Sequence, residues 1–313
     1  MYSVAFREGL EVDPAREHWR EAATRPLIWA AWYPSDDGHD PSHQQDRFPV
    51  ILLSHGTGGL AQSLSWLASG LASQGYICLA VSHHGNTCVE PYMAEGFICW
   101  WERARDLSVL LDRLGAKAPF SGRLDLTRVS AVGFSLGGYS VLSLLGARTR
   151  YDLFRDWLAS RKIPDSGPRE FPDLALSLPR LQETSEKFRQ SMDRQNLSYK
   201  DGRITAAVAL APPPPVRAFE PDSLKSITVP VGILVGQNDR EAPHLDCACW
   251  LKQQNPAMEL QLLGKTVGHY VFLPEGTASD KAREPELFYD PEGINRKEIH
   301  KQATDFVLKI IAR

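Results

Sequence analysis

The chain has 313 residues, a formal net charge of −3, 43% hydrophobic residues and 23% charged residues. These values are ordinary for a globular protein, and the charge pattern shows no basic stripe or block that would favour a nucleic acid or an anionic membrane as a partner. The apolar runs are too short for membrane insertion, and the N-terminal residues lack the layout of a signal peptide, so we expect a cytoplasmic protein.

Strand-like and helix-like patterns alternate along the chain. Runs that are apolar throughout are typical of strands covered on both faces, and hence of a parallel sheet. Their alternation with amphipathic helical patterns predicts an α/β fold with an open, mostly parallel sheet flanked by helices. The predicted strands are residues 25–34, 48–56, 75–83, 128–134, 204–212, 229–237 and 258–264.

Residues 150–203 interrupt this alternation. They are polar, have helical patterns and contain no candidate strand. We predict a helical insertion within a single domain covering residues 1–313, lying as a lid or cap over the pocket with Trp157 among the lining residues. The alternative is an insertion packed on the flank of the sheet. The proline-rich stretch that begins at Ala211 is expected to be a stiff loop, because proline cannot continue a helix.

One serine lies between glycines where a predicted strand meets a predicted helix, in Gly133-Phe134-Ser135-Leu136-Gly137. This spacing fits the G-x-S-x-G nucleophile elbow, in which a sharp turn leaves no room for side chains two positions from the serine. The turn presents the hydroxyl at the N-terminus of a helix, where N–H groups favour negative charge. Ser135 is therefore the candidate nucleophile.

A serine hydroxyl needs a base and an orienting acid, which in this fold follow it in the order acid, then histidine. Asp239 lies just past an apolar strand, and His269 lies just past the last predicted strand. Both are expected at the same edge of the sheet as the serine. Glu241 is the alternative acid, and His244 and His300 are the other late histidines. His244 is too close to the acid loop, and His300 falls in the final helix.

An oxyanion hole is expected from two backbone N–H groups. One is that of Leu136, directly after the serine, and the other lies in the loop His55-Gly-Thr-Gly-Gly59, with Thr57 preferred and Gly58 as the alternate. A phosphate loop is excluded because no Lys-Ser/Thr follows. A dinucleotide loop fits the spacing, but the next strand ends without an acid for the ribose.

Further candidates depend on position alone. His83 follows a strand at the site edge and is a candidate substrate contact, as is Phe134 beside the serine. Trp101 is a candidate for an apolar pocket wall, although a core aromatic is the competing interpretation. The histidines show no spacing to carboxylates that would indicate a metal site. The odd number of cysteines predicts reduced thiols, although Cys88 and Cys99 flank one loop and are close enough in sequence to pair under oxidation.

Four segments together, FPVILLSHGTGG, WERARDLSVLLDRL, VGFSLGGYS and VGHYVFL, resemble the α/β-hydrolase superfamily. The resemblance is to the dienelactone-hydrolase-like branch that includes bacterial relatives of platelet-activating-factor acetylhydrolase, and it runs from about Pro26 to the end, outside the insertion. It implies Ser135 as nucleophile, His269 as base and Asp239 as orienting acid, with no cofactor. Phe134 departs from the histidine of many relatives. A serine in place of the dienelactone-hydrolase cysteine favours esterase-like chemistry.

The sequence thus predicts a serine hydrolase that cleaves an ester, lactone or related acyl bond of a small-molecule substrate through an acyl-enzyme. Amide cleavage and acyl transfer on the same three residues remain open alternatives. A hydrolase-fold binding protein without activity is the alternative from another class, but such a protein has no reason to keep all three residues in order.

Overall fold

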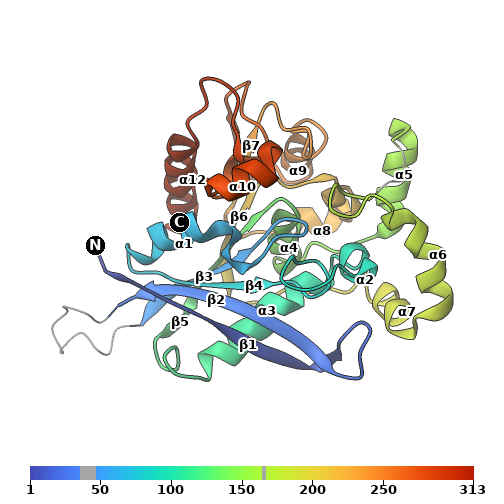
Figure 1. Cartoon of the computed structure of the whole chain (residues 1–313), viewed down its shortest axis with the longest axis horizontal. Helices are drawn as coiled ribbons and strands as arrows, with labels where there is room; N and C mark the ends of the chain where they lie inside the picture. The colour runs from blue at the N-terminus through green and yellow to red at the C-terminus, as the bar shows by residue number, and fades with distance from the viewer. Residues whose placement is uncertain (36–46, 164–166) are drawn as a thin grey trace.

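The computed structural model describes residues 1–35, 47–163 and 167–313, which form an eight-stranded sheet with flanking helices (Figure 1). The strand order is β1-β2-β4-β3-β5-β6-β7-β8. β2 runs antiparallel to both neighbours, and the other neighbouring pairs are parallel. The open, mostly parallel sheet expected from the sequence is confirmed. The strands are β1 (Val4–Glu17), β2 (Thr24–Pro34), β3 (Phe48–Ser54), β4 (Ile77–Ser82), β5 (Leu124–Phe134), β6 (Ile204–Leu210), β7 (Val231–Gly236) and β8 (Glu259–Leu263).

The edge strand β1 is the one strand of this sheet that the sequence patterns did not predict. It pairs only with β2, and most of its side chains are exposed or half-buried. An edge strand with so little buried surface needs no apolar run, and β1 carries charged residues, Gly9 and Pro14 instead. The predicted strands 25–34, 48–56 and the five that follow them correspond to β2 through β8.

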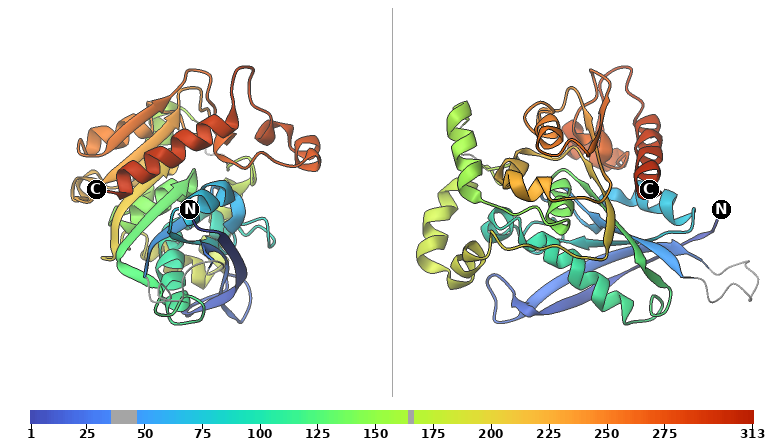
Figure 2. Two further views of the ribbon diagram at one scale, coloured as in Figure 1. Left: turned by 90° about the vertical axis from the view of Figure 1, so that its left-hand side faces the viewer. Right: turned by 180° about the vertical axis from the view of Figure 1, so that it is seen from behind.

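The direction of the crossovers places the helices on two faces. The chain steps from β3 to β4 in one direction and then returns past β3 to β5, so right-handed crossovers put the first and second connecting helices on opposite faces. The C-terminal helix packs against the first connecting helix, and Figure 2 shows it lying along one face of the twisted sheet. Within the described ranges, none of the helices is long and apolar enough to cross a bilayer. The α-helices outside the insertion are α1 (Ser65–Ala72), α2 (Ala94–Ile98), α3 (Glu102–Gly115), α4 (Leu136–Leu144), α8 (Pro221–Lys225), α9 (Ala248–Gln254), α10 (Ala278–Arg283), α11 (Pro285–Phe288) and α12 (Arg296–Ile311).

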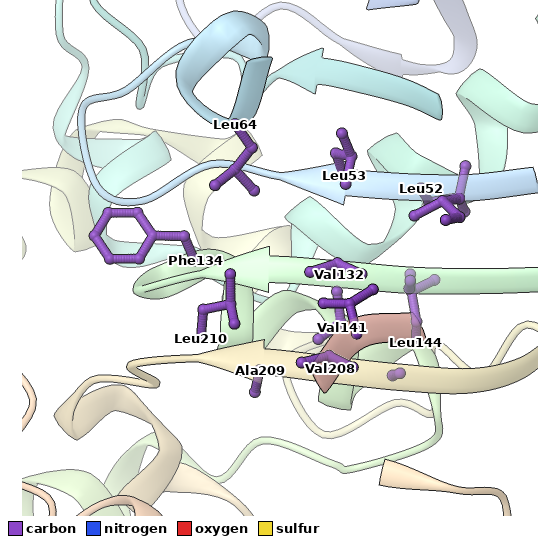
Figure 3. Close-up of a cluster of buried hydrophobic side chains, with 14 of the residues drawn as sticks. Leu52, Leu53, Leu64, Val132, Phe134, Val141, Leu144, Val208, Ala209 and Leu210 are labelled. Carbon is purple, nitrogen blue, oxygen red and sulfur yellow. The ribbon is translucent and has the colours of Figure 1, made fainter. Parts of the chain in front are cut away.

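The main core lies between the central strands and the helices that cover them (Figure 3). Leu52 of β3, Val132 of β5, Val208 of β6 and Val141 of α4 are all fully buried. Each such side chain stabilises the fold by roughly 1.5–3 kcal/mol relative to exposure. This packing fixes the carboxyl ends of β3 and β5, from which the loops of the candidate site leave.

The insertion forms three helices, α5 (Tyr151–Arg161), α6 (Leu174–Thr184) and α7 (Glu186–Asp193), grouped at the end of the molecule opposite the N-terminus (Figures 1 and 2). Apolar side chains of α6 and α7, including Leu174 and Phe188, join a second buried cluster with residues of α2. Phe154 of α5 packs instead against the main core. Beyond the insertion, the proline-rich stretch expected to be a loop contains a short 3₁₀ helix, η3 (Pro214–Ala218). The first N–H groups of a helix have no partner within the helix, so prolines at its start lose no hydrogen bond.

Candidate active site

The turn between β5 and α4 has the geometry of a nucleophile elbow. Ser135 adopts φ 53° and ψ −124°, a backbone conformation that residues other than glycine rarely adopt. A Cβ added at Gly133 would lie 2.0 Å from the Gly137 carbonyl oxygen, and one added at Gly137 would lie 2.0 Å from the Ser54 carbonyl oxygen. Both glycines of the motif are thus required by close backbone approach, as the sequence spacing indicated.

The structure brings Ser135, His269 and Asp239 into one hydrogen-bonded chain. His269 Nε2 lies 2.9 Å from Ser135 Oγ, and His269 Nδ1 lies 2.7 Å from Asp239 Oδ2. The second carboxylate oxygen of Asp239 accepts a hydrogen bond from the Ala242 backbone N–H at 2.6 Å. The aspartate is therefore held on both oxygens, and it fixes the orientation of the imidazole toward the serine.

The alternative residues lie elsewhere. Glu241 is exposed to solvent, whereas the side chain of Asp239 is fully buried against the histidine. The ring of His300 stacks on Trp66 with centroids 3.8 Å apart, and its Nε2–H donates to the Val271 carbonyl at 2.9 Å. His300 therefore joins α12 to the segment after His269, and its ring makes structural contacts.

The predicted oxyanion loop lies against the elbow. A Cβ added at Gly56 would lie 3.1 Å from Ser135 Cβ, so the loop backbone passes directly beside the serine. The Gly58 N–H already donates to Asn86 Oδ1 at 2.8 Å. Within the described ranges the N–H groups of Thr57 and of Leu136, the first residue of α4, have no hydrogen-bond acceptor. Thr57 is thus a better-placed donor than the alternate, Gly58.

The four predicted pocket residues have different surroundings. The Phe134 ring packs against the His269 ring with centroids 4.9 Å apart. Trp157 stacks near Phe154 and lies under the Arg217 guanidinium. Trp101 is fully buried and its indole N–H donates to Ser191 of α7, so it anchors the insertion and has no surface for a substrate contact.

His83 is also fully buried and belongs to a second Ser–His–Asp chain. Its Nε2 lies 2.8 Å from Ser54 Oγ, and its Nδ1 lies 2.9 Å from Asp106 Oδ2. Asp106 also accepts hydrogen bonds from Arg16 and Arg25. Contrary to the sequence expectation, His83 therefore has no exposed surface from which to touch a substrate. It links β3, β4 and α3 beneath the site.

Two residues of the insertion reach the site without a sequence signal. Glu170 Cγ would lie 2.8 Å from a Cβ added at Gly58, so this side chain covers the oxyanion loop. Burial raises the pKa of the Glu170 carboxyl, and His269 is among the charged groups that act on it. The neighbouring Arg169 forms ion pairs with Glu284 and Glu286, which follow His269 in the chain. Residues 167–171 therefore connect the oxyanion loop to the segment that carries α10 and α11.

A separate cluster of His18, His84 and Glu90 has potential metal-ligand atoms within 4.8 Å of one another. His84 Nδ1 is hydrogen-bonded to Glu90 at 2.8 Å, and its Nε2 accepts the Trp19 backbone N–H. His18 Nδ1 accepts two backbone N–H groups. Three of the four ring nitrogens thus already have hydrogen-bond partners from the chain, so the cluster is explained by hydrogen bonding alone. The five cysteines have free thiols in the structure, Cys88 exposed and Cys99 buried among them.

The sequence matches the alpha/beta hydrolase family over residues 50–279, a range that contains Ser135, Asp239 and His269. The chain belongs to the alpha/beta hydrolase family. Among solved structures, a ferulic acid esterase from Streptomyces cinnamoneus superposes on this hydrolase with a TM-score of 0.63. That comparison covers 99% of this chain and 89% of the other at 18% sequence identity, which demonstrates a shared fold.

Curated relatives match a shorter part of this alpha/beta hydrolase. The cutinase est1 of Thermobifida alba is 28% identical over 107 residues, which is 34% of this chain and 33% of that protein. A bis(hydroxyethyl) terephthalate hydrolase of Streptomyces coelicolor is also 28% identical over 107 residues, with 34% and 31% covered. The chain therefore spans about a third of the length of these relatives.

Proposed function

We propose that the protein is a cofactor-independent serine hydrolase that cleaves carboxylic esters of small molecules. The observation that carries this proposal is the continuous hydrogen-bonded chain from Ser135 Oγ through the His269 ring to Asp239, with the serine held at a strained turn. A chain of nucleophile, base and orienting acid within hydrogen-bond reach is the arrangement that activates a serine hydroxyl.

In the proposed mechanism, Ser135 Oγ attacks the ester carbonyl carbon while His269 Nε2 accepts the hydroxyl proton. The carbonyl oxygen becomes an oxyanion, which the N–H groups of Thr57 and Leu136 stabilise. Collapse of this intermediate breaks the bond to the alcohol, which leaves with the proton from His269. Water then attacks the acyl-enzyme, again with His269 as base, and releases the carboxylic acid. Asp239 stabilises the imidazolium in each half-reaction.

The names of the relatives support ester substrates over other acyl compounds. They include cutinases and a terephthalate hydrolase, and the fold neighbour is a ferulic acid esterase. Placement in the dienelactone-hydrolase-like branch rests on the sequence motifs. A cytoplasmic location, and the absence of nucleic-acid and membrane partners, stay predictions from the sequence.

The insertion is proposed to act as a cap on this site. Its loop residues 167–171 support the role, because Glu170 lies on the oxyanion loop and Arg169 pairs with the segment after His269. Apolar side chains of α6 and α7 are used in packing with α2. The cap is therefore a fixed wall of the pocket whose polar loop faces the reaction.

Activity on p-nitrophenyl esters of graded acyl length tests the proposal, together with labelling by a fluorophosphonate probe. We expect hydrolysis and labelling in the native chain and neither in S135A. Faster turnover of p-nitroanilides, or acyl transfer to an added alcohol, would instead favour the amidase or acyltransferase alternatives. Equal probe labelling of S135A and the native chain would exclude Ser135 as the nucleophile.

A further inference from the structure

An oxyanion hole works only if its donors keep a fixed spacing, about 2.7–3.1 Å from the oxygen they stabilise. In this protein the two proposed donors come from different parts of the chain. Thr57 lies in the loop after β3, and Leu136 begins α4 after β5. Pairing of Ser54 with Gly133 already brings the ends of β3 and β5 side by side. A further contact to both segments comes from a side chain at the N-terminal end of α3.

The guanidinium of Arg103, the second residue of α3, lies between these two segments and is 1% exposed. Its Nε donates to Ser140 Oγ at 3.0 Å, and its Nη1 donates to Asn86 Oδ1 at 3.4 Å. Its Nη2 donates to the His55 carbonyl and, at 3.5 Å, to Ser54 Oγ. One side chain thus contacts β3, the oxyanion loop, the loop after β4, and α4.

Each branch of the guanidinium leads to one oxyanion donor. On the helix side, the Ser140 hydroxyl donates a hydrogen bond to the Leu136 carbonyl at 3.0 Å, which fixes the first turn of α4. On the loop side, Arg103 holds the His55 carbonyl directly, two residues before Thr57. It also reaches Asn86, whose Oδ1 accepts the Gly58 N–H at 2.8 Å, one residue after Thr57. The loop is therefore held on both sides of its donor.

The charge of Arg103 is not needed for any direct ion pair. Among the residues that the structure describes, its hydrogen-bond acceptors are all uncharged, and the nearby Asp106 is bound instead by Arg16, Arg25 and His83. Burial lowers the pKa of Arg103, which reflects the cost of keeping this cation away from water. A buried charge without a direct counter-ion is unfavourable for stability, so its retention here calls for another role.

We propose that Arg103 is a positioning residue that sets the distance between the two oxyanion donors, Thr57 and Leu136. This inference rests on the proposed serine-hydrolase function. A guanidinium suits the task because its N–H groups form a rigid planar fork, whereas a lysine ammonium is a single point on a flexible stem. The chemical step, and not substrate binding, should therefore depend on it.

The helix branch is tested by the matched pair S140A and S143A, with kcat, KM and melting temperature measured on a p-nitrophenyl ester. Both serines are fully buried on α4, but Ser143 Oγ has no hydrogen-bond partner among the described residues. We expect S140A to lower kcat about tenfold, a fraction of the roughly 10²–10³ lost with a whole donor. KM should be unchanged, and S143A should keep the native kcat.

The loop branch is tested by N86A, N86D and R103K on the same ester. Aspartate keeps an oxygen to accept the Gly58 N–H, so N86D should retain several times more kcat than N86A. R103K keeps the charge but loses the fork, and we expect its kcat to fall by about 10²-fold, within the range for loss of one donor. If R103K does not fold, the serine and asparagine variants decide the question.

The outcomes separate this inference from the proposed function. If S135A retains native activity, the proposed function fails and this inference fails with it. If S135A is inactive but S140A has the same kcat as S143A, and N86A the same as N86D, Arg103 does not position the donors. A fall in melting temperature with unchanged kcat would assign Arg103 a purely structural role and would also overturn the inference.

Discussion

The molecule contains two Ser–His–Asp chains with almost the same geometry. In Ser135–His269–Asp239 the serine-to-histidine and histidine-to-aspartate distances are 2.9 and 2.7 Å. In Ser54–His83–Asp106 they are 2.8 and 2.9 Å. Hydrogen-bond distances alone therefore do not identify a nucleophile, because they would assign both chains the same chemistry.

The surroundings of the two chains differ in access to the serine, in backbone conformation and in ion pairing. Ser135 is 7% exposed at a positive φ on a helix N-terminus, whereas Ser54 is fully buried at the end of a strand. Among the described residues, Asp239 forms an ion pair with His269 alone, while Asp106 binds Arg16 and Arg25 as well as its histidine. Access, backbone strain and free N–H donors support the proposal that the Ser135 chain is the reactive one, and ion pairing supports a structural role for the Ser54 chain.

Replacing the two serines gives the sharpest contrast between the chains. If Ser135 is the nucleophile, S135A should lose on the order of 10⁶-fold in kcat, as a serine protease does when its nucleophile is removed. S54A removes one hydrogen bond in the buried chain and should keep kcat within about tenfold, with a stability loss of about 1–3 kcal/mol. Ester turnover and urea unfolding of both variants check this. A larger loss of kcat in S54A than in S135A would reverse the assignment of the two chains.

Replacing the two aspartates should separate catalysis from stability. D239N leaves the imidazole in the wrong tautomer, and we expect kcat to fall about 10⁴-fold with little change in unfolding free energy. D106N leaves Arg16 and Arg25 without their shared carboxylate, so we expect a stability loss of about 3–5 kcal/mol. E241Q changes the exposed residue that is the alternative acid. It serves as the control, and its kcat and unfolding free energy should match those of the native chain. Damage by E241Q with an active D239N would move the acid to Glu241.

Of the two chains, only the one proposed to be reactive can be predicted from the sequence. Parallel strands buried on both faces appear as long apolar runs, and the elbow appears as two glycines around a serine, so Ser135, Asp239 and His269 can be located by their positions after strands. The second chain has no such sequence pattern. Ser54, His83 and Asp106 meet only through packing of β3, β4 and α3, and ordinary polar residues fill these positions.

The path of the insertion was likewise beyond sequence reasoning. Its apolar residues are expected to cover the pocket mouth, whereas apolar side chains of α6 and α7 pack in one cluster with α2 and Trp101, and Leu176 is exposed. A helical pattern shows that a face is apolar without showing which surface it covers. The burial of Arg103 cannot be predicted from sequence for the same reason, since arginine is mostly an exposed residue and only the fold buries it here.

The buried chain should also make stability depend on pH. Burial, and then the charge of Arg103, lower the pKa of His83 to about 3. Below the ordinary histidine pKa of about 6.5 the unfolded chain takes up a proton that the folded chain does not. Stability should thus fall by up to about 1.4 kcal/mol per pH unit as the pH drops from about 6.5 toward 3.

Unfolding free energies of the native chain and H83Q between pH 7 and pH 4.5 test this dependence. The glutamine cannot titrate, so H83Q should be less stable at pH 7 but have a flatter pH profile. S54A removes a partner of the ring but keeps the titrating group, and it should retain the native slope. Equal slopes in H83Q and the native chain would show that His83 does not contribute to acid sensitivity.

The smallest expected effect concerns access to the Ser135–His269–Asp239 chain. In residues 167–171, Glu170 contacts the oxyanion loop at Gly58, and Arg169 pairs with Glu284 and Glu286. The side chains of these pairs are partly exposed, and such pairs contribute only about 0–1 kcal/mol to stability.

R169A should therefore leave the melting temperature nearly unchanged but release residues 167–171 from their ion pairs. We expect a several-fold shift in kcat/KM toward longer acyl chains, and the same shift in native enzyme at high salt, where exposed charges are screened. The matched control is R150A, because Arg150 forms a similarly exposed ion pair with Asp152 at the start of α5. If R169A and R150A show the same chain-length profile as the native enzyme, the loop does not shape the pocket, and access to Ser135 is set by the elbow and the oxyanion loop alone.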